Sequence, residues 1–563
     1  MSLRPFGFLF LLFSCLFASL TVAHAQTRPR VQVPTEDSSQ ANAIIQQLLR
    51  NGRIIRPSEV KRGMKGFGRS VFQGTTIEEF PIEVIGVLER VQGGGDIVLI
   101  RVTGGTVVKR NSGIVAGMSG SPVYINGKML GAIALGWGFP KEPIGGVTPI
   151  AEMIRTSLPD SAHPAKSAAL PAEFRPKAPL HLAGREIERM VVSRDPQRVA
   201  LAGPRDGATM TMRPATTLLQ ISGMRQSSLP LLRRIFDRYQ LEPVIGPSSQ
   251  KTVPSPPLKP GSAMGVQLVS GDMDQTAVGT VTFRWGDRIL GFGHPMFGQG
   301  AASIPLASTF VHDIFPSYQR SFKLASPIKV VGALQQDTQF AVGGTLGTAA
   351  DTIPMSVSLS DPARKIRRAF HVRVMKDPVL TPQLIGAVAG EAIETTLGLS
   401  SDKMVKVGMA MEIDGAPRIV RHNLLYTQGP ITPAALADLR QTLTITQSNE
   451  FARGSIRRVD LSVSIDDSRR LATIKSMVAN RNKVRAGETV QISVQLEPIA
   501  TPHKYITRTF NFKVPADAPD GQMRVAALPG TAFWSGQVRV GGAPPEPSNL
   551  QELVAAWNRV GAF

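Results

Sequence analysis

The chain of 563 residues contains a single cysteine, Cys15. That cysteine lies in an apolar stretch near the N-terminus that is typical of a cleaved leader, so the mature chain would contain none. The absence excludes disulfides, zinc sites built on thiolates and catalysis by a cysteine nucleophile. An exported protein without disulfides depends on its hydrophobic core, which a chain of this length is able to form.

Long apolar runs are also scarce. One stands out, at 6–22, preceded by Arg4 and followed by Ala-His-Ala at 23–25. This arrangement predicts a secretory signal peptide over 1–25, cleaved before Gln26, and therefore an exported protein of the periplasm or the extracellular space. No other stretch reaches the ~20 apolar residues that a membrane span needs, so we expect no transmembrane segment after removal of the signal.

Long amphipathic helical patterns are missing, whereas glycine and proline are abundant, with 53 and 43 residues. Short apolar runs alternate with turn residues, which predicts a mainly β protein of three or four domains. Evenly spaced strand-like runs near the C-terminus favour an immunoglobulin-like sandwich. The expected units are a signal peptide at 1–25, a linker at 26–53, a serine-bearing β-barrel unit at 54–155, a linker with a helical excursion at 156–260, a histidine-bearing β-rich unit at 261–430, an immunoglobulin-like β-sandwich at 455–545 and a tail at 546–563.

Some local patterns predict individual elements. The dipeptide Asn126-Gly127 between two apolar runs is typical of a two-residue β-hairpin turn. The spacing of apolar residues at 229–239 predicts an amphipathic helix, and shorter helices are expected at 41–49 and 549–559.

The formal charge is +21, from 63 basic and 42 acidic residues. The basic residues are scattered, which favours a diffuse positive surface; the alternative is an anionic component of the cell envelope as partner. No nucleic-acid motif accompanies them, so no nucleic acid is expected. The glycine run at 93–95 lacks the Lys-Ser/Thr and the helix of a phosphate-binding loop, and we expect no cofactor and no metal.

The sequence GMSGSP at 117–122 lies between two apolar runs. Small residues on both sides of Ser119 allow a tight turn and leave its backbone N–H free to bind a substrate oxygen. Taken alone, the same residues also suit an ordinary turn between strands. Ser121 differs from Ser119, because the following Pro122 favours extended backbone and the start of the next strand.

Several blocks around this motif resemble the SpoIVB peptidase family. They are 62–75, FPIEVIGVLE at 80–89, GIVAGMSGSPVYINGKMLGA at 113–132 and GGVTPI at 145–150. The resemblance covers about 55–155 and, more loosely, 260–310. It implies a trypsin-like double β-barrel and a serine endopeptidase. In that family's chemistry Ser119 would be the nucleophile, and the N–H groups of Gly117 and Ser119 would form the oxyanion hole.

Histidine is absent from 54–154, so a catalytic histidine must come from outside the serine-bearing unit. In the family that the chain resembles, a Gly-His motif follows a Gly-Thr-x-Thr-Phe strand. The matching residue is His294, in GFGHPMFG at 291–298. The serine precedes the histidine here, the reverse of the family's order. A permuted double barrel accommodates this reversal, since a triad is defined by geometry.

Acidic residues are absent from 97–118, where the family places the acid of its triad. Asp96 is the nearest one upstream and is the candidate for that acid. The acid fixes the tautomer of the imidazole, a task that a backbone carbonyl can partly perform. Four further candidates flank the histidine block and stay open: Asp272, Asp274, Asp287 and Asp313.

Two functions remain in competition. The first is an exported serine endopeptidase that hydrolyses peptide bonds of an envelope protein or of itself. The second is a non-catalytic binding or scaffold protein of the cell envelope that retains the peptidase fold. The missing acid, the reversed order and the large β-rich C-terminal half favour the second. The distance between Ser119 and His294 discriminates between them, because a peptidase needs the two side chains within hydrogen-bond reach.

Overall fold

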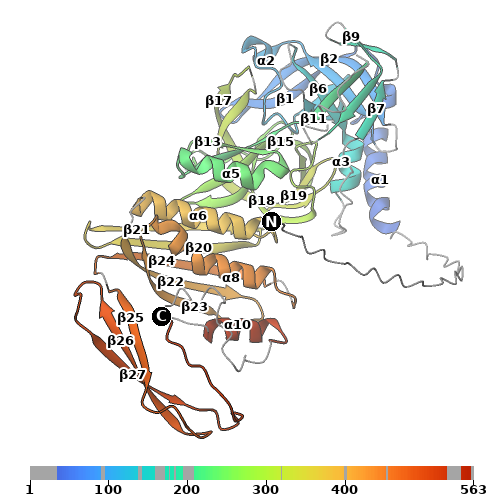
Figure 1. Ribbon diagram of the computed structural model, residues 1–563. Helices are drawn as coiled ribbons and strands as arrows, with labels where there is room; N and C mark the ends of the chain where they lie inside the picture. The colour runs from blue at the N-terminus through green and yellow to red at the C-terminus, as the bar shows by residue number, and fades with distance from the viewer. Residues whose placement is uncertain are drawn as a thin grey trace, which may run out of the picture.

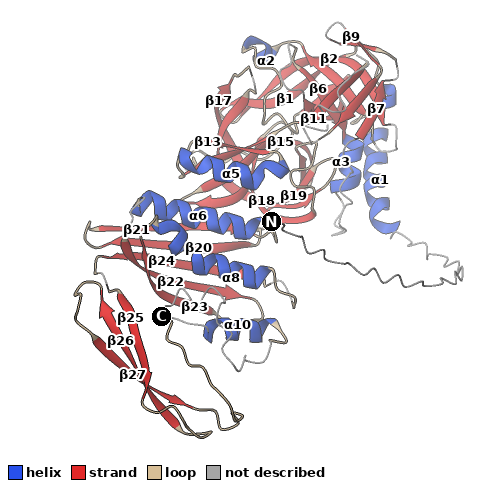
Figure 2. Cartoon of the chain, in the orientation of Figure 1, coloured by secondary structure: helices blue, strands red, loops and turns tan. Residues whose placement is uncertain are grey.

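Strands make up about half of the described part of the chain and far outnumber helices (Figure 2), which confirms a mainly β protein. The computed structural model describes 35–90, 95–136, 142–158, 172–176, 178–182, 185–193, 208–250, 252–318, 320–398, 402–451, 454–468, 470–528 and 547–559. The signal peptide expected at 1–25, with Cys15, lies outside the described residues.

Six strands near the N-terminus close into an antiparallel barrel, the first barrel. The pairings run β1–β2–β3–β6–β5–β4 and return to β1. Alternate side chains point inward along such strands, and they fill the barrel with apolar residues such as Phe80, Ile100 and Leu130. The strands are β1 (Lys65–Gln73), β2 (Thr76–Arg90), β3 (Ile97–Val102), β4 (Pro122–Ile125), β5 (Lys128–Gly136) and β6 (Ile144–Pro149).

The hairpin predicted at Asn126-Gly127 is confirmed, since these two residues join β4 to β5. Both have positive φ, 51° and 74°, as the favoured two-residue turn requires. This turn fixes the strand that begins three residues after Ser119.

Helices and additional strands surround the first barrel. The helix expected at 41–49 is longer, α1 (Thr35–Arg50), and it packs with α3 (Ile150–Ser157) on the outside of the barrel (Figure 1). A short helix, α2 (Gly105–Lys109), precedes the Ser119 turn. The segment 156–260, expected as a linker with a helical excursion, contains that helix as α5 (Leu229–Phe236) but also strands. These strands are β7 (Ala172–Pro176), β8 (Leu180–Leu182), β9 (Arg185–Ile187), β10 (Arg189–Val192), β11 (Thr209–Pro214), β12 (Thr217–Ser222) and β13 (Leu241–Ile245).

A second set of six strands also pairs in a circle, which we call the second ring. The antiparallel pairings run β14–β15–β16–β19–β18–β17 and return to β14. The strands are β14 (Ala263–Gly271), β15 (Asp274–Trp285), β16 (Arg288–Gly291), β17 (Gly300–Phe315), β18 (Phe322–Asp337) and β19 (Val342–Leu346). Isolated bridges, Gly74 to Val311 and Ala116 to Phe322, connect the first barrel to the second ring.

The sheet of the second ring continues through β21, β20, β24, β22 and β23. Helices cover one face of this extension (Figure 1), and their apolar side chains share its core. The strands are β20 (Thr352–Asp361), β21 (Ile366–Met375), β22 (Lys403–Ile413), β23 (Ile419–Thr427) and β24 (Ile456–Asp466). The helices are α6 (Leu380–Leu397), α7 (Ile431–Ala435), α8 (Ala437–Gln447) and α10 (Leu550–Arg559), the last confirming the helix expected at 549–559.

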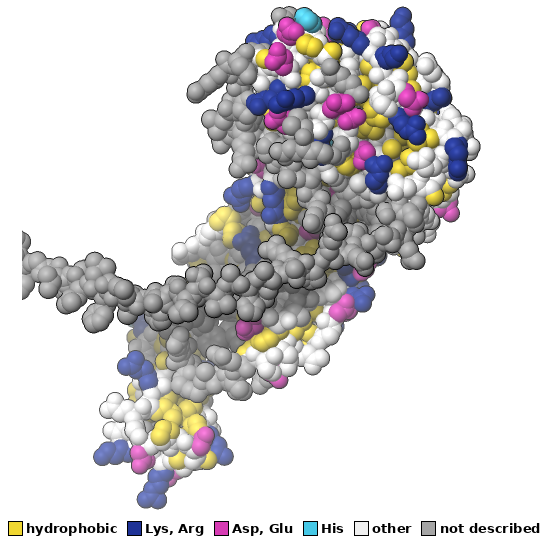
Figure 3. All heavy atoms as spheres, turned by 90° about the vertical axis from the view of Figure 1, so that its right-hand side faces the viewer, with side chains coloured by type: hydrophobic (Ala, Val, Ile, Leu, Met, Phe, Trp, Pro, Cys, Tyr) yellow, Lys and Arg dark blue, Asp and Glu magenta, His cyan; other side chains and the backbone are white. Residues whose placement is uncertain are grey.

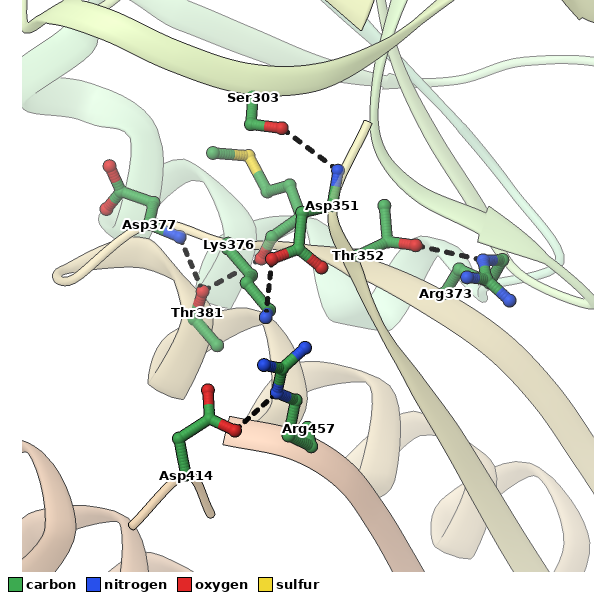
Figure 4. Close-up of polar contacts among 10 residues, drawn as sticks. Ser303, Asp351, Thr352, Arg373, Lys376, Asp377, Thr381, Asp414 and Arg457 are labelled. Carbon is green, nitrogen blue, oxygen red and sulfur yellow. Dashed lines mark hydrogen bonds and ion pairs between the residues drawn. The ribbon is translucent and has the colours of Figure 1, made fainter. Parts of the chain in front are cut away.

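One polar contact joins this extension to the second ring where β20 begins, and two more lie within the extension beside it (Figure 4). The N–H of Asp351 donates to Ser303 of β17 at 2.9 Å, and Lys376 forms an ion pair with Asp351 at 2.7 Å. Arg373 donates to Thr352 at 2.9 Å. The second ring and its extension are thus continuous in both sheet and side-chain contacts.

The segment expected to form an immunoglobulin-like sandwich divides between two sheets. β24 lies within 455–545 but pairs with β20 and β22 in the large sheet. Three further strands form a small sheet of their own: β25 (Ala472–Ala479), β26 (Thr489–Pro498) and β27 (Ile506–Lys513). Among the described residues of 455–545, no strand pairs into a second sheet against these three. Because sheet pairing is non-local, strand spacing alone did not reveal that β24 belongs to the large sheet.

None of the helices in the described part of the chain is long and apolar enough to cross a membrane. On the upper part of the face shown in Figure 3, Lys and Arg side chains lie interspersed with Asp and Glu side chains. The positive charge on that part of the face is therefore dispersed.

Candidate active site

Ser119 lies in a tight loop between α2 and β4, held by the strand that leads to the histidine. The N–H of Thr280 in β15 donates to the carbonyl of Ser119 at 2.8 Å. The hydroxyls of Thr280 and Thr282 donate to the carbonyls of Gly117 and Gly120 at 2.8 and 2.7 Å. Residues i and i+2 of a strand share a face, so both hydroxyls reach the same loop.

Glycine is required where the loop contacts β15 most closely. Gly120 has φ +92°, and a Cβ there would lie 2.0 Å from the carbonyl oxygen of Thr280 and 2.5 Å from the nitrogen of Phe292. Only a residue without a side chain allows the two backbones to approach this closely. The small residues noted in the sequence therefore bring the serine loop against the second ring.

His294 follows a strained turn after β16. Phe292, two residues before it in the turn, has φ +64°, which is unusual for a bulky residue. Its ring is fully buried and packs edge-on to the His294 ring. The carbonyl of Gly293 accepts a hydrogen bond from Thr148 of β6 at 2.8 Å. The first barrel thus holds the histidine turn, just as β15 holds the serine loop.

The two turns bring the predicted pair together. Nε2 of His294 lies 3.0 Å from Oγ of Ser119, although 175 positions separate the residues. Nδ1 of His294 lies 2.9 Å from the carbonyl oxygen of Pro295. A carbonyl only accepts hydrogen bonds, so Nδ1 carries a proton, and in the neutral form of the ring Nε2 presents its lone pair to the serine hydroxyl. This tautomer is the one that a general base for Ser119 requires.

The N–H groups expected to bind an oxyanion differ from their neighbours. The N–H groups of Met118, Gly120 and Ser121 each donate to a backbone carbonyl. Among the hydrogen bonds of the described residues, none uses the N–H of Gly117 or of Ser119. These two donors are therefore available to an incoming oxygen, and their role as an oxyanion hole stays a prediction.

Both side chains of the pair are buried. Ser119 is 1% exposed and His294 is 4% exposed. A peptide carbonyl therefore has no open approach to Ser119 in this conformation.

A buried lysine lies behind the serine loop. The Nζ of Lys323 donates to Ser70 at 2.8 Å, and the hydroxyl of Ser121 donates to the same serine oxygen at 3.0 Å. The methylene groups of Lys323 pack against the position that a Cβ on Gly117 would occupy, the nearest of them 3.0 Å away. Complete burial lowers the pKa of Lys323 to about 7. Ser121 is thus bound to a network that does not include His294, in keeping with its expected difference from Ser119.

The acid expected from the sequence is Asp96. Asp96 lies directly before β3 and is half-buried, and its role as the acid stays a prediction. Each of the four open alternatives has a partner of its own: Asp272 the N–H of His371, Asp274 the side chains of Gln267 and Thr276, Asp287 Arg284, and Asp313 Arg110.

Asp337, at the end of β18, was not among the acids expected from the sequence. Its carboxylate accepts hydrogen bonds from the N–H groups of Met296, Phe297 and Gly298, two to four residues after the histidine. An aspartate at the end of a strand carries no sequence signal of this contact.

Residues 37–147 match the family model of SpoIVB peptidase S55, which confirms the resemblance to the SpoIVB-type family over that segment. The match contains Ser119 and ends before His294. No curated protein and no solved structure matches the chain.

Proposed function

We propose that this protein is a serine endopeptidase in which Ser119 is the nucleophile and His294 the general base. One observation carries the proposal: Oγ of Ser119 and Nε2 of His294 lie 3.0 Å apart, in a tautomer suited to proton transfer. The strained turn that holds His294 and the glycine-dependent turn that holds Ser119 come from different sheets and meet at this point. The match to SpoIVB peptidase S55 includes the serine. A scaffold protein would have no physical need for this arrangement.

The geometry suggests a sequence of steps. Ser119 Oγ attacks the carbonyl carbon of the scissile bond while its proton passes to Nε2 of His294. The N–H groups of Gly117 and Ser119 would donate to the oxyanion that forms. His294 then returns the proton to the leaving amine, and water repeats the cycle on the acyl-enzyme.

The pairing of the strands supports a permuted double β-barrel. The first barrel carries Ser119, the second ring carries His294, and each holds the other's turn through a threonine hydroxyl. A site between two barrels is the arrangement that the trypsin-like fold implies, with the order of the two barrels exchanged along the chain. The small sheet of β25–β27 would be an appended module, whether or not it completes an immunoglobulin-like sandwich.

The burial of the pair adds a requirement to the proposal. Because Ser119 is 1% exposed, a substrate must enter through a local opening between the first barrel and the second ring. The need for this opening would limit the activity of an exported enzyme, acting on an envelope protein or on itself, until its substrate is present. The signal-like residues at 1–25 support export.

Hydrolysis by matched variants tests the proposal. The purified mature chain is incubated with a fluorescein-labelled unfolded protein, and its own cleavage is followed by mass spectrometry. We expect Ser119→Ala and His294→Ala to lower the rate by about 10⁴-fold or more each, and the double variant little further, because the two residues act as one unit.

Ser121→Ala is the control, since Ser121 is hydrogen-bonded to Ser70 and not to His294. It should keep most of the activity. Equal rates in the wild type and Ser119→Ala would overturn the proposal and favour the scaffold alternative.

A further inference from the structure

One peptide group lies between His294 and a buried carboxylate. The carbonyl of the Pro295–Met296 peptide accepts the hydrogen bond of His294 Nδ1 at 2.9 Å. The N–H of the same peptide donates to Oδ1 of Asp337 at 2.8 Å. Hydrogen bonds at the two ends of an amide strengthen each other, because each polarises the shared C–N bond. The histidine and the carboxylate are therefore linked electronically through three atoms of the backbone.

The carboxylate is bound more firmly than a single hydrogen bond would bind it. Oδ2 of Asp337 also accepts the N–H groups of Phe297 and Gly298, at 2.5 and 2.9 Å. Successive N–H groups that point to one centre form a concave anion site. Asp337 is 1% exposed, so these donors replace the water that a charged carboxylate would otherwise need.

We propose that Asp337 is the acidic positioning residue of the Ser119–His294 pair and acts through the Pro295–Met296 peptide. The inference rests on the proposed function. When Ser119 Oγ bonds to the substrate carbon, its proton moves to Nε2, and the ring becomes an imidazolium. The Nδ1 proton stays on the ring, and no proton reaches Asp337. The carboxylate stabilises the positive ring by polarising the peptide oxygen toward Nδ1–H.

The order of the residues along the chain agrees with this role. In chymotrypsin-type enzymes the order is His, Asp, Ser. Here it is Ser119, His294, Asp337, which is the same cycle begun at the serine. A chain that exchanges its two barrels would produce this order, in which the acid still follows the histidine but no longer precedes the serine.

A pH profile is the measurement that separates positioning from simple structural support. Other groups that titrate near this turn are Lys323, behind the serine loop, and Tyr239, whose ring lies edge-on to Phe297 at 5.1 Å. The profiles are therefore also recorded in a Lys323→Met background, so that titration of the lysine is removed. The readout is the rate at which a small fluorophosphonate labels Ser119 between pH 5 and 9.

Asp337→Asn should lower the labelling rate at the plateau by about 10- to 100-fold. It should also move the midpoint of the profile to lower pH, because loss of a nearby negative charge disfavours the imidazolium. Asp361→Asn is the matched control. Asp361 is also buried at the end of a strand, and it also accepts a backbone N–H, that of Arg364, far along the chain from the pair. The Asp361→Asn variant should be less stable than the wild type but keep the wild-type midpoint of the pH profile.

The outcomes separate the inference from the proposed function. If Ser119 is labelled in Asp337→Asn with the wild-type midpoint, the inference is wrong and the peptidase proposal stands. If Asp96→Asn moves the midpoint and Asp337→Asn does not, Asp96 is the acid and the inference is overturned. If Ser119 is never labelled in the wild type, the proposed function fails, and the inference with it.

A second measurement covers the case in which Asp337→Asn does not fold. The unmodified protein at low pH should show a downfield proton resonance from Nδ1–H of His294, identified by its loss in His294→Ala. Such a resonance reports a strong hydrogen bond to a polarised carbonyl. Its absence from the wild type would overturn the inference.

Discussion

Replacing Gly120 by alanine places a single methyl group between the serine loop and β15. The new Cβ would lie 2.0 Å from the carbonyl oxygen of Thr280, whereas an ordinary contact needs at least 3.4 Å. The two backbones must therefore separate by about 1.4 Å, the difference between those distances. The two atoms that this Cβ would meet, the oxygen of Thr280 and the nitrogen of Phe292, belong to the backbone, so no side chain can rotate away.

Gly127→Ala provides the matched control. Gly127 also has positive φ, +74°, but a Cβ there meets nothing within 4 Å. Both variants incur the backbone strain of a left-handed alanine, about 1–2 kcal/mol. Only Gly120→Ala adds the overpacking term, about 1–3 kcal/mol. The difference between their free energies of unfolding therefore isolates the contact between the serine loop and β15.

The effect on activity should exceed the effect on stability. A separation of this size would break the 2.8 Å bond from Thr280 N–H to Ser119 and pull Oγ away from His294. A misplacement of about 1 Å can lower a rate about 100-fold. Urea unfolding and the hydrolysis assay measure the two effects. If Gly120→Ala matches Gly127→Ala in both stability and rate, the close approach does not position the nucleophile.

The remaining predictions concern the surrounding groups and the ends of the chain. The pKa of Lys323 in the folded protein is about 7, below the 10.5 of an unfolded chain, so unfolding takes up a proton between these values. The stability of the wild type relative to Lys323→Met should therefore rise from pH 7 to 10 in urea titrations; a constant difference would contradict the burial of the amine. Thr280→Val removes the hydroxyl that donates to Gly117 and should lower the hydrolysis rate more than Thr276→Val, whose hydroxyl bonds to Asp274; equal losses would refute a role for Thr280 in the loop. N-terminal sequencing of the exported protein should begin at Gln26, whereas a lipid-bearing start at Cys15 would disprove the predicted cleavage.

Local chemistry made part of this structure predictable. The Asn126-Gly127 turn needs only its own two positive φ angles, and the helix at Leu229–Phe236 needs only its apolar spacing. Ser119 and His294 were found because each lies in a glycine-rich turn, because no histidine occurs in 54–154, and because His294 matches the Gly-His motif of the family that the chain resembles. Their 3.0 Å separation matches the prediction of hydrogen-bond reach, while their catalytic roles await experiment.

Other features depend on contacts that distant parts of the chain make. β24 has the same alternating pattern as β25 and β26, so nothing in its sequence assigns it to β20 and β22. The strands β7–β13 are short and lie between proline-rich stretches that resemble linkers. Asp337 accepts hydrogen bonds from a turn 39–41 positions away, and a strand-terminal aspartate has many other uses. Such pairings follow from the closed fold and not from any local propensity.

The reactivity of Ser119 in the intact protein tests the central claim most directly, because it needs no knowledge of the natural substrate. The protein is treated with a small fluorophosphonate for long enough to sample local opening, and the modified residue is located by peptide mass mapping. We expect one adduct, on Ser119, which is retained in Ser121→Ala and lost in His294→Ala, where Oγ has no base. An unmodified Ser119, or an adduct that forms equally well without His294, would contradict the central claim.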